Sequence, residues 1–232
     1  MISVIGLLDG ITATIIIVGA VALGLLSVYN GKRLKSNLIT SSGFMMIFVG
    51  FLWLRPFTEF LSVLFVGRNL NPAYIYGYLS YAWVAPAIIA AMYLGGEIIL
   101  PKRKWILVGI FAVLGVIFEL FLFLDTPNTF EGFTVNNPGD LLDASFKRQS
   151  FAFILIAIFL VSTLILLGIG FLVKAQQAPS GVNKRFRFLS LGVFTFVIGA
   201  ALDSIIPVGV AIGIIRIITV SSAFWMYFGL KP

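Results

Sequence analysis

The chain has 232 residues, of which 60% are hydrophobic and only 11% are charged, and its net charge is +7. A soluble domain has about a quarter of its residues charged, so most of this chain's surface is predicted to face lipid. The sequence contains no cysteine and no histidine. This excludes disulfides, thiolate nucleophiles and every metal or haem site that uses histidine. The basic residues lie in short loops between apolar runs, so the positive charge indicates membrane topology rather than nucleic-acid binding.

Apolar runs long enough to cross a bilayer recur along the whole chain. A spanning helix needs about 20 mostly apolar residues. Seven stretches satisfy this condition, at 10–29, 38–58, 74–98, 105–124, 150–173, 187–206 and 208–229. The sequence therefore predicts an all-α fold, in which residues 1–232 form one polytopic seven-transmembrane-helix bundle surrounded by membrane lipids.

The direction of the spans is predicted from the basic residues in alternate loops. One set of loops holds eleven of them: Lys32, Arg33, Lys35, Lys102, Arg103, Lys104, Lys174, Lys184, Arg185, Arg187 and Lys231. The opposite set holds only three, Arg68, Lys147 and Arg148, beside the acidic residues Asp9, Asp125, Glu131, Asp140 and Asp143. Because basic loops stay inside, we expect the N-terminus outside, the C-terminus in the cytoplasm, and a location in the cell membrane.

Two features are assigned to the membrane surface. Trp53, Trp105 and Trp225 fall near predicted helix ends, as expected of interfacial anchors. The outer loop at 125–148 is rich in proline, glycine and asparagine over its first part, which favours turns over helix. We expect this loop to be a loosely ordered lid, with 141–147 continuing upward from the fifth helix.

Ionisable residues inside spans are costly, so they usually face the bundle interior and have partners. Five remain after the loops are set aside: Arg55, Glu59, Glu119, Asp203 and Arg216. Counting about 1.5 Å per residue from the nearest loop places all of them in the outer half of the membrane. Side chains lean toward the N-terminus of their helix, so Asp203 and Glu119 are predicted to converge in depth on Arg216. Arg55 and Glu59 are spaced i, i+4, which favours a pair on one helix.

Tyrosines of the third span lie at the same level as these charges. Tyr78 and Tyr81 share a helix face, and a phenol in hydrocarbon needs a hydrogen-bond partner. Three interpretations of the charges and phenols remain open. They form a structural polar network, a ligand pocket reached by solvent, or a path for ions or protons.

Several seven-helix classes are excluded by their own signatures. No lysine lies inside a predicted span, and the last span reads RIITVSSAFWMY, so a retinal Schiff base is excluded. The third span ends in GGEIILPKRKW without a DRY-like receptor triplet, and no GxGD or HExxH protease motif lies in a span. We expect no enzymatic activity and no cofactor. Pro86 is the only proline well inside a predicted span, whereas inverted-repeat transporters usually break helices at matching positions in two halves.

The closing stretch carries a family resemblance. FLSLGVFTFVIGAALDSIIP, followed by RIITVSSAFWMYFGLKP, resembles the last helical pair of uncharacterised archaeal seven-helix membrane proteins. Some members of that group form the sensor half of signalling proteins. The resemblance implies the fold and a receptor-like class, and it assigns no functional residue.

These observations predict a receptor-like or sensor-like bundle without a fused output domain. It would bind an unknown small ligand on its outer side and act through a separate cytoplasmic or membrane signalling partner. The alternatives are a transporter of small solutes or ions, and a non-catalytic membrane subunit or lipid-binding protein. No nucleic-acid partner is expected.

Overall fold

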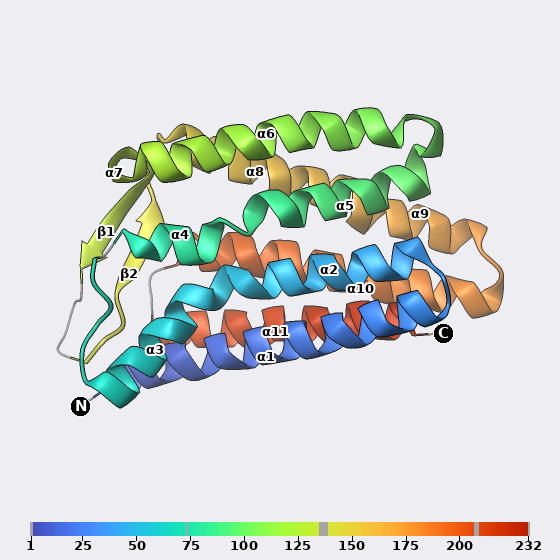
Figure 1. Cartoon of the computed structure of the whole chain (residues 1–232). Helices are drawn as coiled ribbons and strands as arrows, with labels where there is room; N and C mark the ends of the chain where they lie inside the picture. The colour runs from blue at the N-terminus through green and yellow to red at the C-terminus, as the bar shows by residue number, and fades with distance from the viewer. Residues whose placement is uncertain (1, 73, 135–138, 207–208, 232) are drawn as a thin grey trace.

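The computed structural model describes residues 2–72, 74–134, 139–206 and 209–231. Within these ranges, seven helices are long and apolar enough to cross a membrane, as the sequence predicted. They run back and forth along one long axis (Figure 1). The spans are, in chain order, α1 (Val4–Arg33); α2 (Asn37–Gly50) with η1 (Phe51–Trp53) and α3 (Leu54–Val66); α4 (Ile75–Tyr81) with α5 (Val84–Ile99); η2 (Pro101–Arg103) with α6 (Lys104–Leu124); α8 (Phe151–Thr163) with the π-helical η3 (Leu164–Ile169) and α9 (Gly170–Gln177); α10 (Ser180–Asp203); and α11 (Val210–Leu230).

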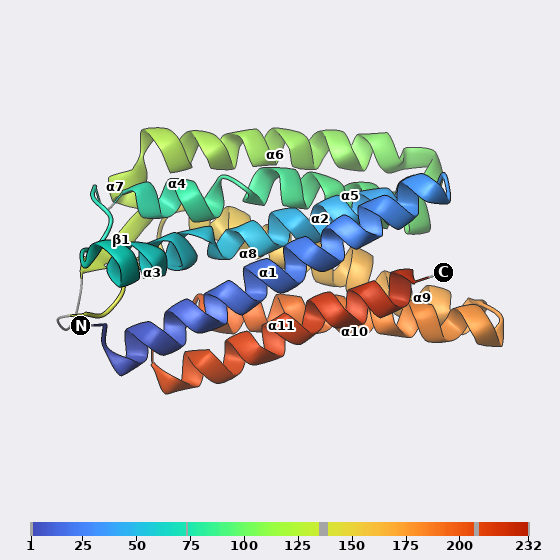
Figure 2. The ribbon, with the colours of Figure 1, turned by 60° about the horizontal axis from the view of Figure 1, so that its bottom comes forward.

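The two ends of the bundle differ. One end, called the hairpin end below, holds the N-terminus, the short α7 (Thr126–Thr129) and the strands β1 (Phe130–Thr134) and β2 (Asp143–Phe146) (Figure 1). The other, called the basic end, holds the C-terminus and the connections from α1 to α2, α5 to α6 and α9 to α10. These connections and the adjoining helix ends carry eleven of the sixteen basic residues, so most of the positive charge lies at one end. The rotated view in Figure 2 shows α1 lying between α2 and α11, with which it packs.

The outward faces of the helices are apolar, which is what a lipid environment requires. On α6, Phe111, Phe118 and Leu122 are buried, whereas Ile106 and Val113 on the other side are 62% and 61% exposed. A helix at the surface of a soluble protein carries polar residues on its outer face. The exposed apolar face of α6 therefore supports a bundle surrounded by lipid.

The first two spans are longer than the sequence predicted. α1 begins at Val4 rather than near residue 10, because Ser3 caps it by accepting a hydrogen bond from the Gly6 N–H at 2.9 Å. The second span continues beyond residue 58 to Val66. Asp9, Arg55 and Glu59 consequently lie within helices rather than at their ends.

The expectation of a loosely ordered lid was wrong for the described residues. β1 and β2 pair antiparallel, with Phe130 opposite Phe146. Both phenylalanines are buried, at 1% and 6% exposure, and both contact Tyr81. Residues 143–146 form this strand instead of extending the fifth helix, because strand alternation turns Ala144 and Phe146 inward. Residues 135–138 of the expected lid lie outside the described ranges.

Two prolines interrupt neighbouring spans at the same level. Pro56 lacks an N–H and disfavours helical geometry in the preceding turn, and the 3₁₀ turn η1 stands there. Pro86 acts likewise where α4 ends and α5 begins. A hydrogen bond joins the two spans at this level: the Arg55 N–H donates to Ser80 Oγ at 3.2 Å. Pro86 is therefore not the only proline well inside a span, because the second span continues to Val66, well past Pro56.

Candidate functional site

Arg216 is the centre of a buried ionic network in the hairpin half of the bundle. Its Nε donates to Asp203 Oδ1 at 2.9 Å, and its Nη1 donates to Asp9 Oδ1 and, at 3.2 Å, to the Asp9 carbonyl. Arg216 and Asp9 are 5% and 4% exposed. One guanidinium thus joins α1, the last residue of α10 and the second turn of α11.

Close helix contacts bring these three residues together. A Cβ at Gly213 would lie 2.5 Å from a methyl carbon of Leu8, so the glycine lets the Leu8 side chain of α1 pack directly on the backbone of α11. A Cβ at Gly199 would lie 2.1 Å from the Thr219 hydroxyl, so α10 and α11 are also in close contact at this glycine. Gly213 precedes Arg216 by one turn and Leu8 precedes Asp9. The glycine contact therefore places Asp9 against the guanidinium.

The predicted pairing of Arg216 was half correct. Asp203 contacts Arg216 as its depth indicated. Glu119 does not, and no salt bridge joins its carboxylate to a basic side chain within the described chain. Glu119 lies on the face of α6 that packs against α5 at Ala85, through Gly115 one turn earlier. Asp9, which the sequence assigned to an outer loop, takes the place predicted for Glu119.

Arg55 and Glu59 form the predicted i, i+4 ion pair on α3, and both side chains are completely buried. Glu59 Oε1 also accepts from Asn69 Nδ2 at 2.7 Å, and Arg55 Nη2 lies 3.5 Å from the Leu70 carbonyl. The Asn69 amide reaches on to the Asp140 carbonyl at 3.2 Å.

This second cluster continues to the N-terminus of the chain. Ser3 Oγ donates to the Asp140 carboxylate, and the Ser3 N–H donates to the Gly139 carbonyl at 2.9 Å. The cluster therefore ties α3, the segment before α4, the strand hairpin and the start of α1 together. It lies at the hairpin end of the bundle.

The two predicted tyrosines connect elements of the hairpin end. The Tyr78 hydroxyl lies 3.1 Å from Thr126 Oγ1 and 3.4 Å from the Phe123 carbonyl. Tyr81 stacks on Phe130 and meets Phe146 edge-on. Tyr78 thus fixes α4 to the end of α6, whereas Tyr81 holds the strand hairpin over the bundle.

Trp53 is a residue whose role the sequence misassigned. It was predicted to anchor the membrane surface, but it is 4% exposed and packs among Ala13, Ile16 and Ile17 of α1. Its indole Nε1 is buried and finds no hydrogen-bond acceptor within the described residues. Trp53 ends η1, so the interruption before Pro56 turns this side chain into the bundle. Trp105, by contrast, is 68% exposed, as expected of an anchor.

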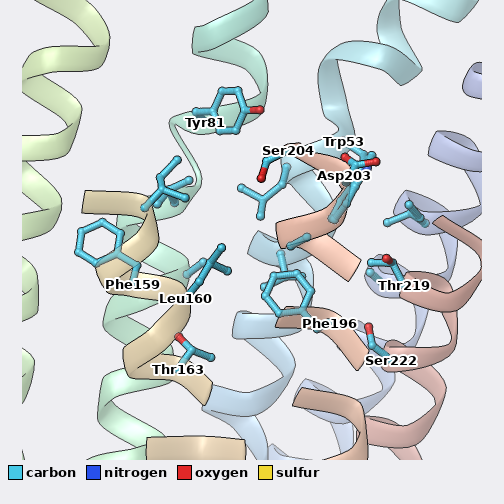
Figure 3. A pocket seen from close by; sticks show the side chains of 18 of the residues that line it. Trp53, Tyr81, Phe159, Leu160, Thr163, Phe196, Asp203, Ser204, Thr219 and Ser222 are labelled. Carbon is cyan, nitrogen blue, oxygen red and sulfur yellow. The ribbon is translucent and has the colours of Figure 1, made fainter. Parts of the chain in front are cut away.

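An internal cavity of about 310 Å³ lies beside these residues. Among the described residues, every span except the one containing α6 contributes to its lining, and β2 lies across it. Figure 3 shows Trp53, Asp203 and Ser204 toward one end of it, Thr163 and Ser222 toward the other, and Phe159, Leu160 and Phe196 between them. Arg216 also lines the cavity. The volume is at the lower limit of the range typical of small-molecule sites.

The cavity reaches the hairpin end, where Ser145, Ile205 and Ile206 line it. On most helices its lining stops well short of the basic end: at Ala20 on α1, Met45 on α2, Ala91 on α5, Thr163 on α8 and Val193 on α10. Only α11 contributes a deeper residue, Met226. Most of the cavity lining therefore lies in the hairpin half of the bundle.

The described residues contain no group of three or more acidic side chains, cysteines or histidines that could hold a metal ion. The candidate site therefore consists of the cavity, the Arg216 network on its wall and Trp53. Compared with known proteins, the chain matches no protein-family model and none of the curated proteins.

Proposed function

We propose that this chain is a receptor-like or sensor-like membrane protein of the cell membrane, which binds a small molecule in the internal cavity and catalyses no reaction. The observation that carries the proposal is a cavity lined mainly in the hairpin half, with an ionic network on its wall. Small-molecule sites are typically apolar cavities with a few placed polar groups, often between the helices of a bundle.

The proposed mechanism is a rearrangement of helices around Arg216. This residue holds α1, α10 and α11 together, and it lines the cavity. A ligand that changes its contacts would shift α11 relative to α1 and α10. All three helices extend to the basic end. A separate cytoplasmic or membrane partner would detect the shift at that positively charged end.

The proposed orientation places the hairpin end outside and the basic end in the cytoplasm, and a matched pair of substitutions tests it. Gln149 and Gln177 are both exposed, the first beside β2 and the second at the end of α9. The chain has no cysteine, so Gln149→Cys and Gln177→Cys each introduce a single thiol. On intact cells, a membrane-impermeant thiol reagent is expected to label only Gln149→Cys. Labelling of Gln177→Cys alone would reverse the orientation.

Access to the cavity tests the proposed function. Ser222 is 5% exposed and lines the cavity, whereas its neighbour Ser221 does not line it. A receptor should admit a small water-soluble thiol reagent to Ser222→Cys from the hairpin side only. In vesicles of either orientation, we expect modification of Ser222→Cys from that side, at least tenfold faster than modification of Ser221→Cys.

Modification of Ser222→Cys from both sides would contradict the receptor proposal and favour a transporter. Absence of modification from either side would favour a non-catalytic or lipid-binding subunit. The transporter has one observation of its own in support. Adjacent spans are interrupted at Pro56 and Pro86, and the fifth contains the π-helical turn η3 beside Thr163 of the cavity lining. Interrupted helices are common at transport sites, and π-helical turns at functional sites in general.

A further inference from the structure

Two hydrogen-bond donors of the cavity wall have no acceptor within the described chain. The first is Trp53 Nε1, which belongs to a side chain that is only 4% exposed. The second is Nη2 of Arg216, because the hydrogen bonds of this guanidinium involve only Nε and Nη1. Only Trp53 Nε1 is fully enclosed, so the cost of an unmet buried donor applies to it. A buried donor without a partner costs about 1–3 kcal/mol. Both residues line the same cavity, so an occupant with an acceptor group would satisfy them.

The charges around Arg216 restrict the kind of acceptor. Its guanidinium keeps its proton at any ordinary pH, and it is bonded to the two carboxylates of Asp9 and Asp203. With both carboxylates ionised, the network carries one net negative charge. A carboxylate or phosphate ligand would add another negative charge in a medium where repulsion is weakly screened. A cationic group would lack the lone pair that the two donors require.

The rest of the cavity is suited to an apolar body. Met45, Met46, Phe159, Leu160 and Phe196 are among its lining residues. The hydroxyl of Thr219, also in the lining, already donates to the Ile215 carbonyl at 2.9 Å. The two unsatisfied donors therefore stand at one region of an otherwise largely apolar space.

We propose that the cavity binds an uncharged, mainly apolar molecule that carries a hydrogen-bond-accepting carbonyl at one end. This inference rests on the proposed function and names the ligand class of the same site. The carbonyl accepts from Trp53 Nε1 and Arg216 Nη2, and the apolar body extends toward Met45 and Phe159. Ketones, aldehydes, quinones and esters share this chemistry.

The test uses 2-dodecanone as the probe, with dodecanoate, dodecylamine and dodecane as comparison compounds of the same chain length. Binding is measured as the excess of each compound in lipid nanodiscs that contain the protein over empty nanodiscs. The carbonyl of 2-dodecanone is labelled with ¹³C, and its infrared stretching band reports hydrogen bonding. Bound 2-dodecanone is expected to show a second, lower-frequency carbonyl band, and the other three compounds are expected to bind more weakly.

Three variants locate the site. Trp53→Phe keeps an aromatic side chain but removes the donor, so the Kd of 2-dodecanone should rise about tenfold and the lower-frequency band should weaken. Ala200→Phe fills the cavity, which Ala200 lines, and should abolish binding. Ala157→Phe adds the same bulk on an exposed position of α8 outside the lining and should leave binding unchanged.

Stronger binding of dodecanoate, dodecylamine or dodecane than of 2-dodecanone would overturn the proposed ligand class. Equal binding of 2-dodecanone by the unmodified chain and by Trp53→Phe, with the same carbonyl band, would also overturn it. Neither result would alter the access of reagents to Ser222→Cys, so a wrong ligand class and a wrong function can be told apart. If Ala200→Phe fails to fold, Trp53→Phe and the infrared band still decide the question.

Discussion

Replacing Glu59 with leucine is expected to lower the free energy of unfolding by about 3–5 kcal/mol, because the change leaves a buried arginine without its counter-charge. Arg55 and Glu59 are both completely inaccessible to solvent. The substitution also removes the acceptor of the 2.7 Å hydrogen bond from Asn69. Titration with sodium dodecyl sulfate in mixed micelles, followed by far-ultraviolet circular dichroism, measures the loss.

A second ion pair of the same chain provides the matched control. Lys104 and Glu97 pair near the basic end with side chains that are 20% and 33% exposed. Solvent-exposed pairs contribute about 0–1 kcal/mol, so Glu97→Leu should change stability far less than Glu59→Leu. The double variant Arg55→Met/Glu59→Leu should recover part of the loss, because apolar residues then replace both charges. Equal effects of Glu59→Leu and Glu97→Leu would contradict this account.

The spans were predictable because a helix in lipid needs about 20 mostly apolar residues in a row, which the sequence shows directly. Long apolar runs require no knowledge of neighbours, and the helices of the structure coincide with them. The ends were harder where charge interrupts the pattern. Thr58 and Glu59 resemble the start of a loop, yet α3 continues to Val66, because Arg55 neutralises Glu59 within the helix.

Contacts within one helix were also predictable, and contacts between helices only by depth. The spacing of Arg55 and Glu59 is sufficient to predict their pair. Arg216 and Asp203 are brought together by the short α10–α11 connection, which fixes their relative depth. Asp9 and Glu119 both lie in the hairpin half, and the sequence does not say which of the two is beside α11. That choice depends on the lateral order of helices, which Gly213 and Leu8 help to set.

The cavity and Trp53 could not have been predicted in the same way. A tryptophan near a helix end is typical of the membrane interface, and the signal against that assignment is Pro56, three residues later. The proline interrupts the helix after η1 and turns Trp53 inward. The cavity itself is formed by side chains from spans far apart in the sequence, so no local pattern indicates it.

Replacing Arg216 with methionine is expected to destabilise the bundle by about 3–5 kcal/mol, because two carboxylates then lose the cation between them. Asp9 is 4% exposed and accepts from Arg216 through both its carboxylate and its carbonyl. Asp203 is bonded through the Nε at 2.9 Å. Thermal melting in detergent, compared with the unmodified chain, measures the effect.

Second substitutions in the Arg216→Met background identify the carboxylate that matters. Asp9→Asn should recover part of the lost stability, because it removes a buried negative charge and keeps the shape of the side chain. Glu119→Gln is the matched control, since Glu119 lies at a similar depth on α6 but makes no contact with Arg216. Residues outside a shared network have nearly additive effects, so Glu119→Gln should change the melting temperature equally with and without Arg216.

Recovery by Glu119→Gln but not by Asp9→Asn would show that α6, rather than α1, faces the guanidinium. An unchanged melting temperature in Arg216→Met would mean that the network contributes little to stability, and that Arg216 serves the cavity alone.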